Sequence, residues 1–416
     1  MRCPESIRAL DDKDPLAHTI KQFDLPAQTQ YLDGNSLGPL PKASRQRLME
    51  VTQNQWGQDL IASWNKHDWI NLPRKVGDKI AKLVGAAPGQ VVCCDSTSVN
   101  LFKVLSTALH LQAQQGRHRI LSQQDNFPTD LYMAEGLSSL LGQARCELIS
   151  VHADKLIDCL DESVAILMLT QVNFRTGHCH DIHALTKAAH DAGALVIWDL
   201  AHSAGAMPIS LDEWNVDFAV GCGYKYLNGG PGAPAFLYAA SRHHGAGTQP
   251  LSGWMGHAKP FEFSPNYKPA QSVDQYLCGT PSVLAMSALD AALDVFDGVD
   301  LDCVRAKSLA LSDLYINTLQ DSDCWQELRL LTPTDHAQRG SQVALAHPHG
   351  YAITQALIAD RCVADFRAPD VIRFGFTPLY LRYEDVWLAA QKLIRIVRER
   401  TYLQPEFKQN AAGPVT

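Results

Sequence analysis

The chain has 416 residues, 46% of them hydrophobic and 19% charged, which is ordinary for a globular protein and enough for more than one domain. It carries 36 basic and 44 acidic residues, a net charge of −8, and neither a basic stripe nor a long apolar run supports nucleic-acid binding or a membrane span. The opening residues, MRCPESIRALDDKD, lack the apolar core of a signal peptide, and the cysteines are scattered apart from Cys93 and Cys94, so we expect a protein of the reducing cytoplasm.

Alternating strands and helices are expected through the middle of the chain. Val91–Cys94 is a short apolar strand, Asp95 or Ser96 can cap the helix that follows, and Gly116 can end it. Val164–Thr170 is almost wholly apolar, as expected for a strand of a parallel sheet that is covered on both faces. A further helix and three further strands are expected at 184–192, 194–199, 217–222 and 234–239. This alternation predicts an α/β fold with a mostly parallel sheet flanked by helices.

The last third of the chain has a different pattern, with longer helices and short strands between them. Helices are expected at 304–319 and 386–400, and strands at 341–347 and 371–376. We therefore expect a large α/β domain at 51–285, a smaller α+β domain at 286–416, and an N-terminal segment, 1–50, that packs with the small domain.

Three groups with related chemistry follow strands of the predicted large domain. Asp199 ends one strand, Lys225 follows another, and the sequence Ser-Thr-Ser at 96–98 follows a third. Ligands of open α/β sheets bind beyond the carboxyl ends of the strands. Pyridoxal phosphate needs a lysine for a Schiff base, an acid opposite its pyridine nitrogen, and an anion site such as a helix N-terminus. Each residue alone is more simply a solvated lysine or a helix cap, but together and in this order they predict a pyridoxal-phosphate site.

The motifs around these residues resemble known enzymes. WDLAHSAGAMP followed by GCGYKYLNGGPG is similar to the fold-type I, class V aminotransferase-like family of pyridoxal-phosphate enzymes. More narrowly, blocks between residues 31 and 380 together resemble the bacterial kynureninases: YLDGNSLGPLP, SWN, STSVNLFKVL, NFPTDLYMAEGL, WDLAHSAGA, GYKYLNGGPG, PLSGWMGH, YLCGTPS and RFGFTPLY. The resemblance implies a homodimer with active sites at the subunit interface. It also implies hydrolytic Cβ–Cγ cleavage of L-kynurenine to anthranilate and L-alanine, with weaker activity on 3-hydroxykynurenine.

The resemblance further implies which residues contact the cofactor. Lys225 would form the Schiff base and move protons, Asp199 would pair with the pyridine nitrogen, and Tyr224 would bind the phosphate and donate a proton. The other expected cofactor contacts are Thr97, Ser98, Phe127, Asp130, Thr170, His202, Trp254 and Thr280. From the residues alone, Phe127 is more simply a hydrophobic loop anchor, Asp130 could equally be a helix cap, and the alternative role of His202 is a packed histidine. Tyr226 is left without a functional role.

Substrate contacts are implied in the same way. Arg373 lies in an apolar strand and matches the arginine that binds the substrate carboxylate, and its alternative role is a structural salt bridge. Trp64 with Gly279 and Thr280 resembles the bacterial pattern that favours kynurenine over its 3-hydroxy derivative, although Trp64 could serve packing alone.

Two other functions are compatible with parts of the pattern. A cysteine desulfurase or selenocysteine lyase needs a reactive cysteine late in the chain, and neither Cys324 nor Cys362 has a suitable sequence context. A non-catalytic α/β binding protein would make Lys225 structural. The cluster HCHDIH at 178–183 has metal-ligating residue types but no standard zinc spacing, so we expect surface histidines and no metal.

Overall fold

The structure is a computed structural model that describes residues 3–408, and its chain divides into two compact units. One unit comprises Ser44–Asn173 and His180–Leu293, and the remaining described residues form the other unit. The short segment Phe174–Cys179 therefore belongs to the same unit as the two terminal parts of the chain. No pattern in the sequence indicated this assignment. Within the described residues no helix combines the length and hydropathy that crossing a membrane requires.

The first unit is built on a sheet of seven strands in the order β4-β10-β9-β8-β7-β5-β6. The strands β5 to β9 pair in parallel, and β10 runs antiparallel to both β9 and β4. The strands are β4 Val91–Cys93, β5 Arg119–Gln123, β6 Glu147–Val151, β7 Val164–Thr170, β8 Leu195–Asp199, β9 Phe218–Gly221 and β10 Phe236–Ala239. The predicted mostly parallel α/β sheet is thus confirmed.

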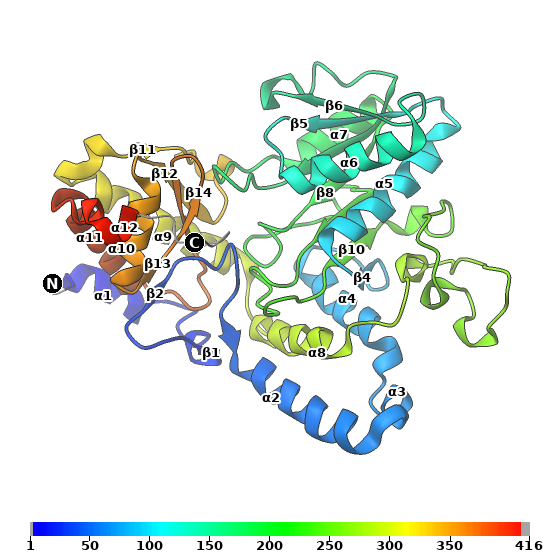
Figure 1. The fold of residues 1–416 in the computed structure, drawn as a ribbon, viewed down its shortest axis with the longest axis horizontal. Coiled ribbons are helices and arrows are strands. Elements are labelled where there is room, and N and C mark those ends of the chain that lie inside the picture. Colours follow the sequence, from blue (N-terminus) through cyan, green and yellow to red (C-terminus); the bar gives the residue numbers. More distant parts are fainter. Residues whose placement is uncertain (1–2, 409–416) are drawn as a thin grey trace. The chain divides into compact units, whose positions relative to one another are not determined.

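Helices pack on this sheet and bury its apolar side chains. Figure 1 shows α5 and α6 beside each other on the strands, and their leucines join residues of β5, β7, β8, β9 and β10 in one buried core. Ser96 caps α5, as one of the two expected caps. The helices of this unit after residue 50 are α3 Ser63–Lys66, α4 Leu72–Leu83, α5 Thr97–Ala113, α6 Pro128–Leu141, α7 Ile182–Asp191 and α8 Val283–Ala292. Helix α2, Lys42–Glu50, leads from the other unit into this one.

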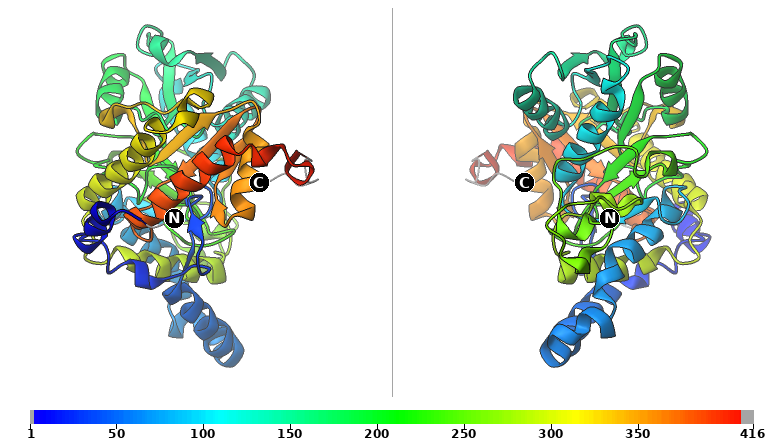
Figure 2. Two further views of the ribbon diagram at one scale, coloured as in Figure 1. Left: turned by 90° about the vertical axis from the view of Figure 1, so that its left-hand side faces the viewer. Right: turned by 90° about the vertical axis from the view of Figure 1, so that its right-hand side faces the viewer.

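The second unit carries a smaller antiparallel sheet in the order β11-β12-β15-β14. Its four strands are β11 Arg329–Leu330, β12 Gln342–Ala346, β14 Asp365–Arg367 and β15 Val371–Gly375. The short pairs β1–β3 and β2–β13 involve Phe23–Asp24, Leu40–Pro41, Gln30–Tyr31 and Cys362–Val363. Figure 2 shows α9 and α11 side by side. The helices of this unit are α1 Glu5–Asp12, α9 Leu301–Gln320, α10 Gly350–Ala359, α11 Tyr383–Arg398 and α12 Pro405–Lys408.

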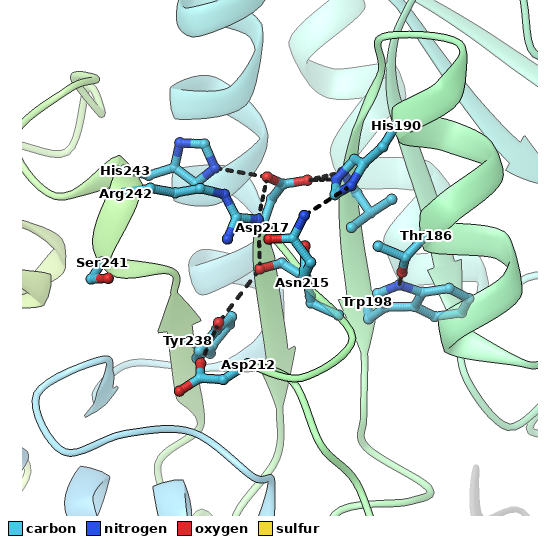
Figure 3. Close-up of polar contacts among 12 residues, drawn as sticks. Thr186, His190, Trp198, Asp212, Asn215, Asp217, Tyr238, Ser241, Arg242 and His243 are labelled. Carbon is cyan, nitrogen blue, oxygen red and sulfur yellow. Dashed lines mark hydrogen bonds and ion pairs between the residues drawn. The ribbon is translucent and has the colours of Figure 1, made fainter.

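An ion cluster around the buried carboxylate of Asp217 lies at the amino ends of β8 and β9 (Figure 3). The carboxylate of Asp217, just before β9, accepts hydrogen bonds from Nε2 of His190 and of His243 at 2.8 and 2.7 Å, from Nη2 of Arg242 at 2.8 Å and from the backbone N–H of Val196 at 2.9 Å. Although burial opposes ionisation, these donors hold the pKa of Asp217 well below its usual value. The carboxylate of Asp217 therefore connects α7, β8, the start of β9 and the loop that carries Arg242 and His243.

Candidate active site

A cavity of about 570 Å³ lies in the sheet unit, where residues that end or follow β4, β7, β8 and β9 converge. This is the carboxyl edge of the parallel strands, the edge at which such sheets bind ligands. Nine of the residues expected to contact the cofactor line it: Thr97, Ser98, Phe127, Asp130, Thr170, Asp199, His202, Tyr224 and Lys225. The strand-end pattern and the family blocks thus led to side chains that share one cavity.

Lys225 lies in the bend that follows β9, and its side chain reaches into the cavity. Its Nζ is 2.9 Å from Nε2 of His202 and 5.8 and 5.9 Å from the ring centroids of Phe127 and Tyr224. The glycines that follow permit a tight loop: a Cβ at Gly229 would lie 2.8 Å from the backbone oxygen of residue 223. The lysine is therefore held between an imidazole and two aromatic rings.

Two buried carboxyl groups, Asp130 and Asp199, lie across the same cavity. Asp199 Oδ1 accepts the backbone N–H of Ala201 at 2.7 Å, and Asp130 accepts the hydroxyl of Thr170 at 3.2 Å. Burial raises the pKa of Asp199, against the lowering effect of the Lys225 charge. Burial also raises the pKa of Asp130, and the neighbouring Asp199 adds to that shift. The positive charge near these two carboxyl groups is thus too small for both to be fully ionised at the same time.

The amino end of α5 forms another wall of the cavity. Ser96 caps the helix by accepting the backbone N–H of Val99 at 3.3 Å, and Thr97 and Ser98 occupy the first turn. The first N–H groups of a helix have no partner within it and lie at the positive end of the helix dipole. This wall can therefore bind an anion such as a phosphate.

Several lining residues were not singled out for the site beforehand. Asp95 is expected near the ligand only as part of the stretch that follows a strand, with no role of its own beyond a helix cap, and Cys222 is expected only as a strand residue, yet both line the cavity. Asn126 does not line the cavity itself, but it is buried and its side-chain oxygen accepts a hydrogen bond from the hydroxyl of the lining residue Thr170. Cys222 directly follows β9, so the rule that found Lys225 could also have found it.

Five of the expected contact residues, all within the described chain, do not line this cavity, and Arg373 is one of them. Trp254 is 37% exposed and packs edge-on against Phe261, while Gly279 and Thr280 are exposed. Trp64 lies in α3 and its ring meets that of Trp69 edge-on at 6.1 Å, as a packing residue would. Their functional roles stay predictions.

Arg373 belongs to the other unit, in β15, and is buried. Its Nε donates to Asp365 Oδ1 at 2.7 Å and its Nη2 to the second oxygen of the same carboxylate, while Nη2 also contacts Ser36 at 3.1 Å. Burial opposes ionisation of Asp365, but the hydrogen bonds from Arg373 hold its pKa below the usual value. The structural ion pair left open from the sequence is present, and the substrate-binding role stays a prediction.

The expectation of surface histidines at 178–183 is wrong for His180. Its side chain is buried, and its Nε2 lies 2.6 Å from Oε1 of Gln123 at the end of β5. It thus fills the space beside the sheet, where a histidine is tolerated because it has a hydrogen-bond partner. No group of three or more metal-ligating residue types is suitably placed for a metal ion anywhere in residues 3–408.

Comparison with solved structures assigns the class of fold. The chain superposes on a cysteine desulfurase from Thermococcus onnurineus with a TM-score of 0.76 and 20% identity, covering 96% of this chain and 99% of that one. The cysteine desulfurase CsdA from Escherichia coli gives a TM-score of 0.74 and 20% identity, covering 92% and 98%. At this identity the likeness shows the fold alone, and the fold is that of the fold-type I pyridoxal-phosphate enzymes.

Sequence relatives then narrow the class. Residues 304–393 match the family model for the kynureninase C-terminal domain. A kynureninase from Burkholderia pseudomallei is 48% identical over 415 residues, which cover 99% of this chain and all of that protein. One from Pseudomonas fluorescens is 46% identical over 402 residues, covering 96% and 97%. The chain belongs to the kynureninase family.

Proposed function

We propose that this protein is a pyridoxal-phosphate-dependent hydrolase that cleaves L-kynurenine between Cβ and Cγ, giving anthranilate and L-alanine. The observation that carries this proposal is one cavity, in a chain of the kynureninase family, where Lys225 meets two buried carboxyl groups and the amino end of α5.

The lining of the cavity fits the three reactive parts of the cofactor. The first turn of α5, with Thr97 and Ser98, suits the phosphate because its N–H groups and dipole favour an anion. Asp199, with Asp130 behind it, suits the ring nitrogen, since a protonated pyridine supplies the positive charge that these buried carboxyl groups lack. The amine of Lys225 suits the aldehyde.

When bound, pyridoxal phosphate supplies an electron-withdrawing ring that acidifies the α-proton of an amino acid. The amine of Lys225 takes that proton, and His202, at 2.9 Å, orients the amine. Burial raises the pKa of the Tyr224 phenol, and the charges of Cys222 and Asp199 add to the shift, so this hydroxyl keeps its proton at neutral pH. It is therefore suited to protonate Cβ after water adds to the γ-carbonyl and the Cβ–Cγ bond breaks.

We assign the substrate carboxylate to Arg373, whose guanidinium is held in a fixed plane by Asp365. The aryl group is assigned to Trp64 with Gly279 and Thr280. A Cβ at Gly279 would meet no atom within 4 Å, so this position imposes no steric limit of its own. We expect lower activity on 3-hydroxykynurenine than on kynurenine.

We also propose that the protein is a homodimer in which Trp254 and Thr280 contact the cofactor of the partner copy. Both residues match cofactor-contacting positions but lie outside the cavity of their own chain. Large apolar side chains are exposed on the same segment and on the helical segment after α2, among them Phe263 at 76% and Ile61 at 80%. Such exposure on a globular protein is typical of an interface.

Subunit mixing tests this arrangement. Lys225→Ala subunits alone should be almost inactive and Trp254→Ala subunits alone should be weakly active, because each homodimer lacks one residue at both sites. Mixed dimers should regain activity, since one of their two sites carries both residues. A mixture as inactive as its parents would contradict the exchange of Trp254.

The proposed reaction is tested by adding L-kynurenine to the cofactor-loaded protein and following anthranilate fluorescence. We expect steady turnover, lower with 3-hydroxykynurenine and absent in Lys225→Ala. Sulfide release from cysteine without anthranilate would favour a desulfurase instead. We further propose that the protein acts in the cytoplasm, with its cofactor in domain 51–285 and a small domain formed by 286–416 with 1–50.

A further inference from the structure

A fully buried lysine lies behind the anion-binding wall of the cavity. Lys103, in the second turn of α5, has 0% of its side chain exposed, and the proposed reaction assigns it no role. Its Nζ is 2.5 Å from Oδ2 of Asp95, 2.5 Å from the backbone oxygen of Tyr276 and 3.8 Å from Sγ of Cys94. Burying an ammonium is costly unless such partners compensate for lost water, so its placement needs a reason.

The charge of Lys103 is maintained by these neighbours. Burial alone would lower its pKa, but the charge of Asp95 and its hydrogen bond to the ammonium act against burial, and the pKa is raised. Burial meanwhile raises the pKa of the Cys94 thiol to about 12, so that thiol is neutral at ordinary pH. The partner that balances the ammonium is therefore the carboxylate of Asp95.

Asp95 occupies the turn that joins β4 to α5 and lines the cavity next to Ser96 and Thr97. Its φ of +47° is a left-handed conformation that residues other than glycine adopt only where their surroundings hold them. The Asp95 carbonyl accepts the N–H of Ala235 at 2.9 Å, so both its backbone and its side chain are fixed. An unpaired carboxylate here would repel an anion bound at the first turn of α5.

The second partner connects this turn to a distant part of the chain. The carbonyl of Tyr276, 173 residues from Lys103, begins the stretch that leads to Gly279 and Thr280. One ammonium therefore holds the start of α5 and the 276–280 segment at a fixed distance from each other.

We propose that Lys103 is a positioning residue for the cofactor phosphate: its ammonium neutralises Asp95 and ties that turn to the 276–280 segment, so that the first turn of α5 accepts a phosphate dianion. This inference rests on the proposed pyridoxal-phosphate site. It assigns Lys103 to phosphate affinity and not to proton transfer, which belongs to Lys225.

The test compares binding of pyridoxal phosphate and of pyridoxal, which lacks the phosphate, to the apoprotein by absorbance titration. Lys103→Met should weaken binding of pyridoxal phosphate about tenfold or more and change that of pyridoxal less than about twofold, because the unbalanced Asp95 carboxylate repels only the phosphate. Lys103→Met/Asp95→Asn should recover most of the lost affinity. Lys187→Met, which removes an exposed lysine in α7, is the matched control and should behave as wild type.

Asp95→Asn alone supplies a second, independent test, because it removes the negative charge and keeps the ammonium. It should weaken binding of pyridoxal phosphate less than Lys103→Met does. Equal losses for both ligands in Lys103→Met, or no recovery in the double variant, would overturn the proposal. Wild-type protein that binds neither ligand would instead refute the proposed cofactor site itself.

Discussion

Two buried aspartates lie at opposite ends of the strands of one sheet, and they differ in how fully their surroundings compensate a negative charge. Asp199 ends β8 at the cavity, and Asp217 precedes β9 at the other edge. Asp217 receives hydrogen bonds from three side chains and one backbone N–H, and its pKa falls. Asp199 receives one backbone N–H, a hydrogen bond from Asp130 and the charge of Lys225, yet burial raises its pKa.

The difference separates a structural carboxylate from a functional one. A buried charge that the chain satisfies completely stabilises the fold but has no capacity left for a ligand. A buried carboxyl group with too few donors costs stability in the free protein and gains most when a cation is placed beside it. We infer that the carboxyl edge of this sheet is built for a ligand and that the amino edge is built for stability.

The largest effect is expected from Lys225→Ala. Removing the amine that binds the cofactor and moves protons should lower kcat about a thousandfold or more, with little change in folding stability. Anthranilate fluorescence gives the rate and the visible absorbance of the bound cofactor reports its attachment. Lys187→Ala, at an exposed position, serves as the control, and substantial turnover by Lys225→Ala would contradict its assignment.

Asp217→Asn should act on stability instead. The substitution removes the buried charge that His190, His243 and Arg242 share, and losing hydrogen bonds to a buried carboxylate costs about 3 kcal/mol of unfolding free energy. Denaturant unfolding measures the loss. With substrate and cofactor saturating, kcat at a temperature where the variant is folded should stay within about twofold of wild type; a large drop would place Asp217 in the catalytic machinery.

Asp199→Asn should show the reverse pattern. Turnover should fall about a hundredfold, because a neutral amide no longer keeps the ring nitrogen protonated. The unfolding free energy of the apoprotein should stay the same or rise, since an under-compensated buried carboxyl group is removed. A loss of stability as large as that of Asp217→Asn would remove the distinction between the two edges.

The smallest effect is the pH dependence of stability. The folded-state pKa of Asp217 lies below the unfolded value, so its contribution is complete above the ordinary aspartate pKa of 3.8 and is lost as pH falls toward the folded pKa. The stability difference between wild type and Asp217→Asn should therefore be constant near neutral pH and shrink below about pH 4. For Asp199 the folded pKa is raised, so Asp199→Asn should gain relative to wild type as pH rises through that folded value.

Local patterns were sufficient for the elements with strong hydrophobic signals. The strand Val164–Thr170 was predicted with its observed limits because all its residues are buried. The neighbouring strands β5 and β6 were not predicted, since Arg119–Gln123 mixes apolar and polar residues and Glu147–Val151 is only half-buried at the edge of the sheet. The sheet itself followed from the alternation of strands with helices.

Site residues could likewise be predicted where their signal is local, and they were missed where their role depends on residues far away in the sequence. Residues at strand ends and in the family blocks were found, because the chemistry they share is visible locally. Lys103 lies inside one of those blocks but was missed, since its partner Tyr276 is 173 residues away. The sequence pattern predicts only a strand position for Asp217, because only the fold brings His190 and His243 to it.

The central claim is that Lys225 carries the cofactor. Borohydride reduction of the loaded protein fixes a Schiff base as a stable amine, and peptide mass spectrometry then locates the modified lysine. We predict one phosphopyridoxyl group per chain, located on the peptide that contains Lys225. A label on Lys103 or another lysine, or labels spread over many lysines, would contradict the account.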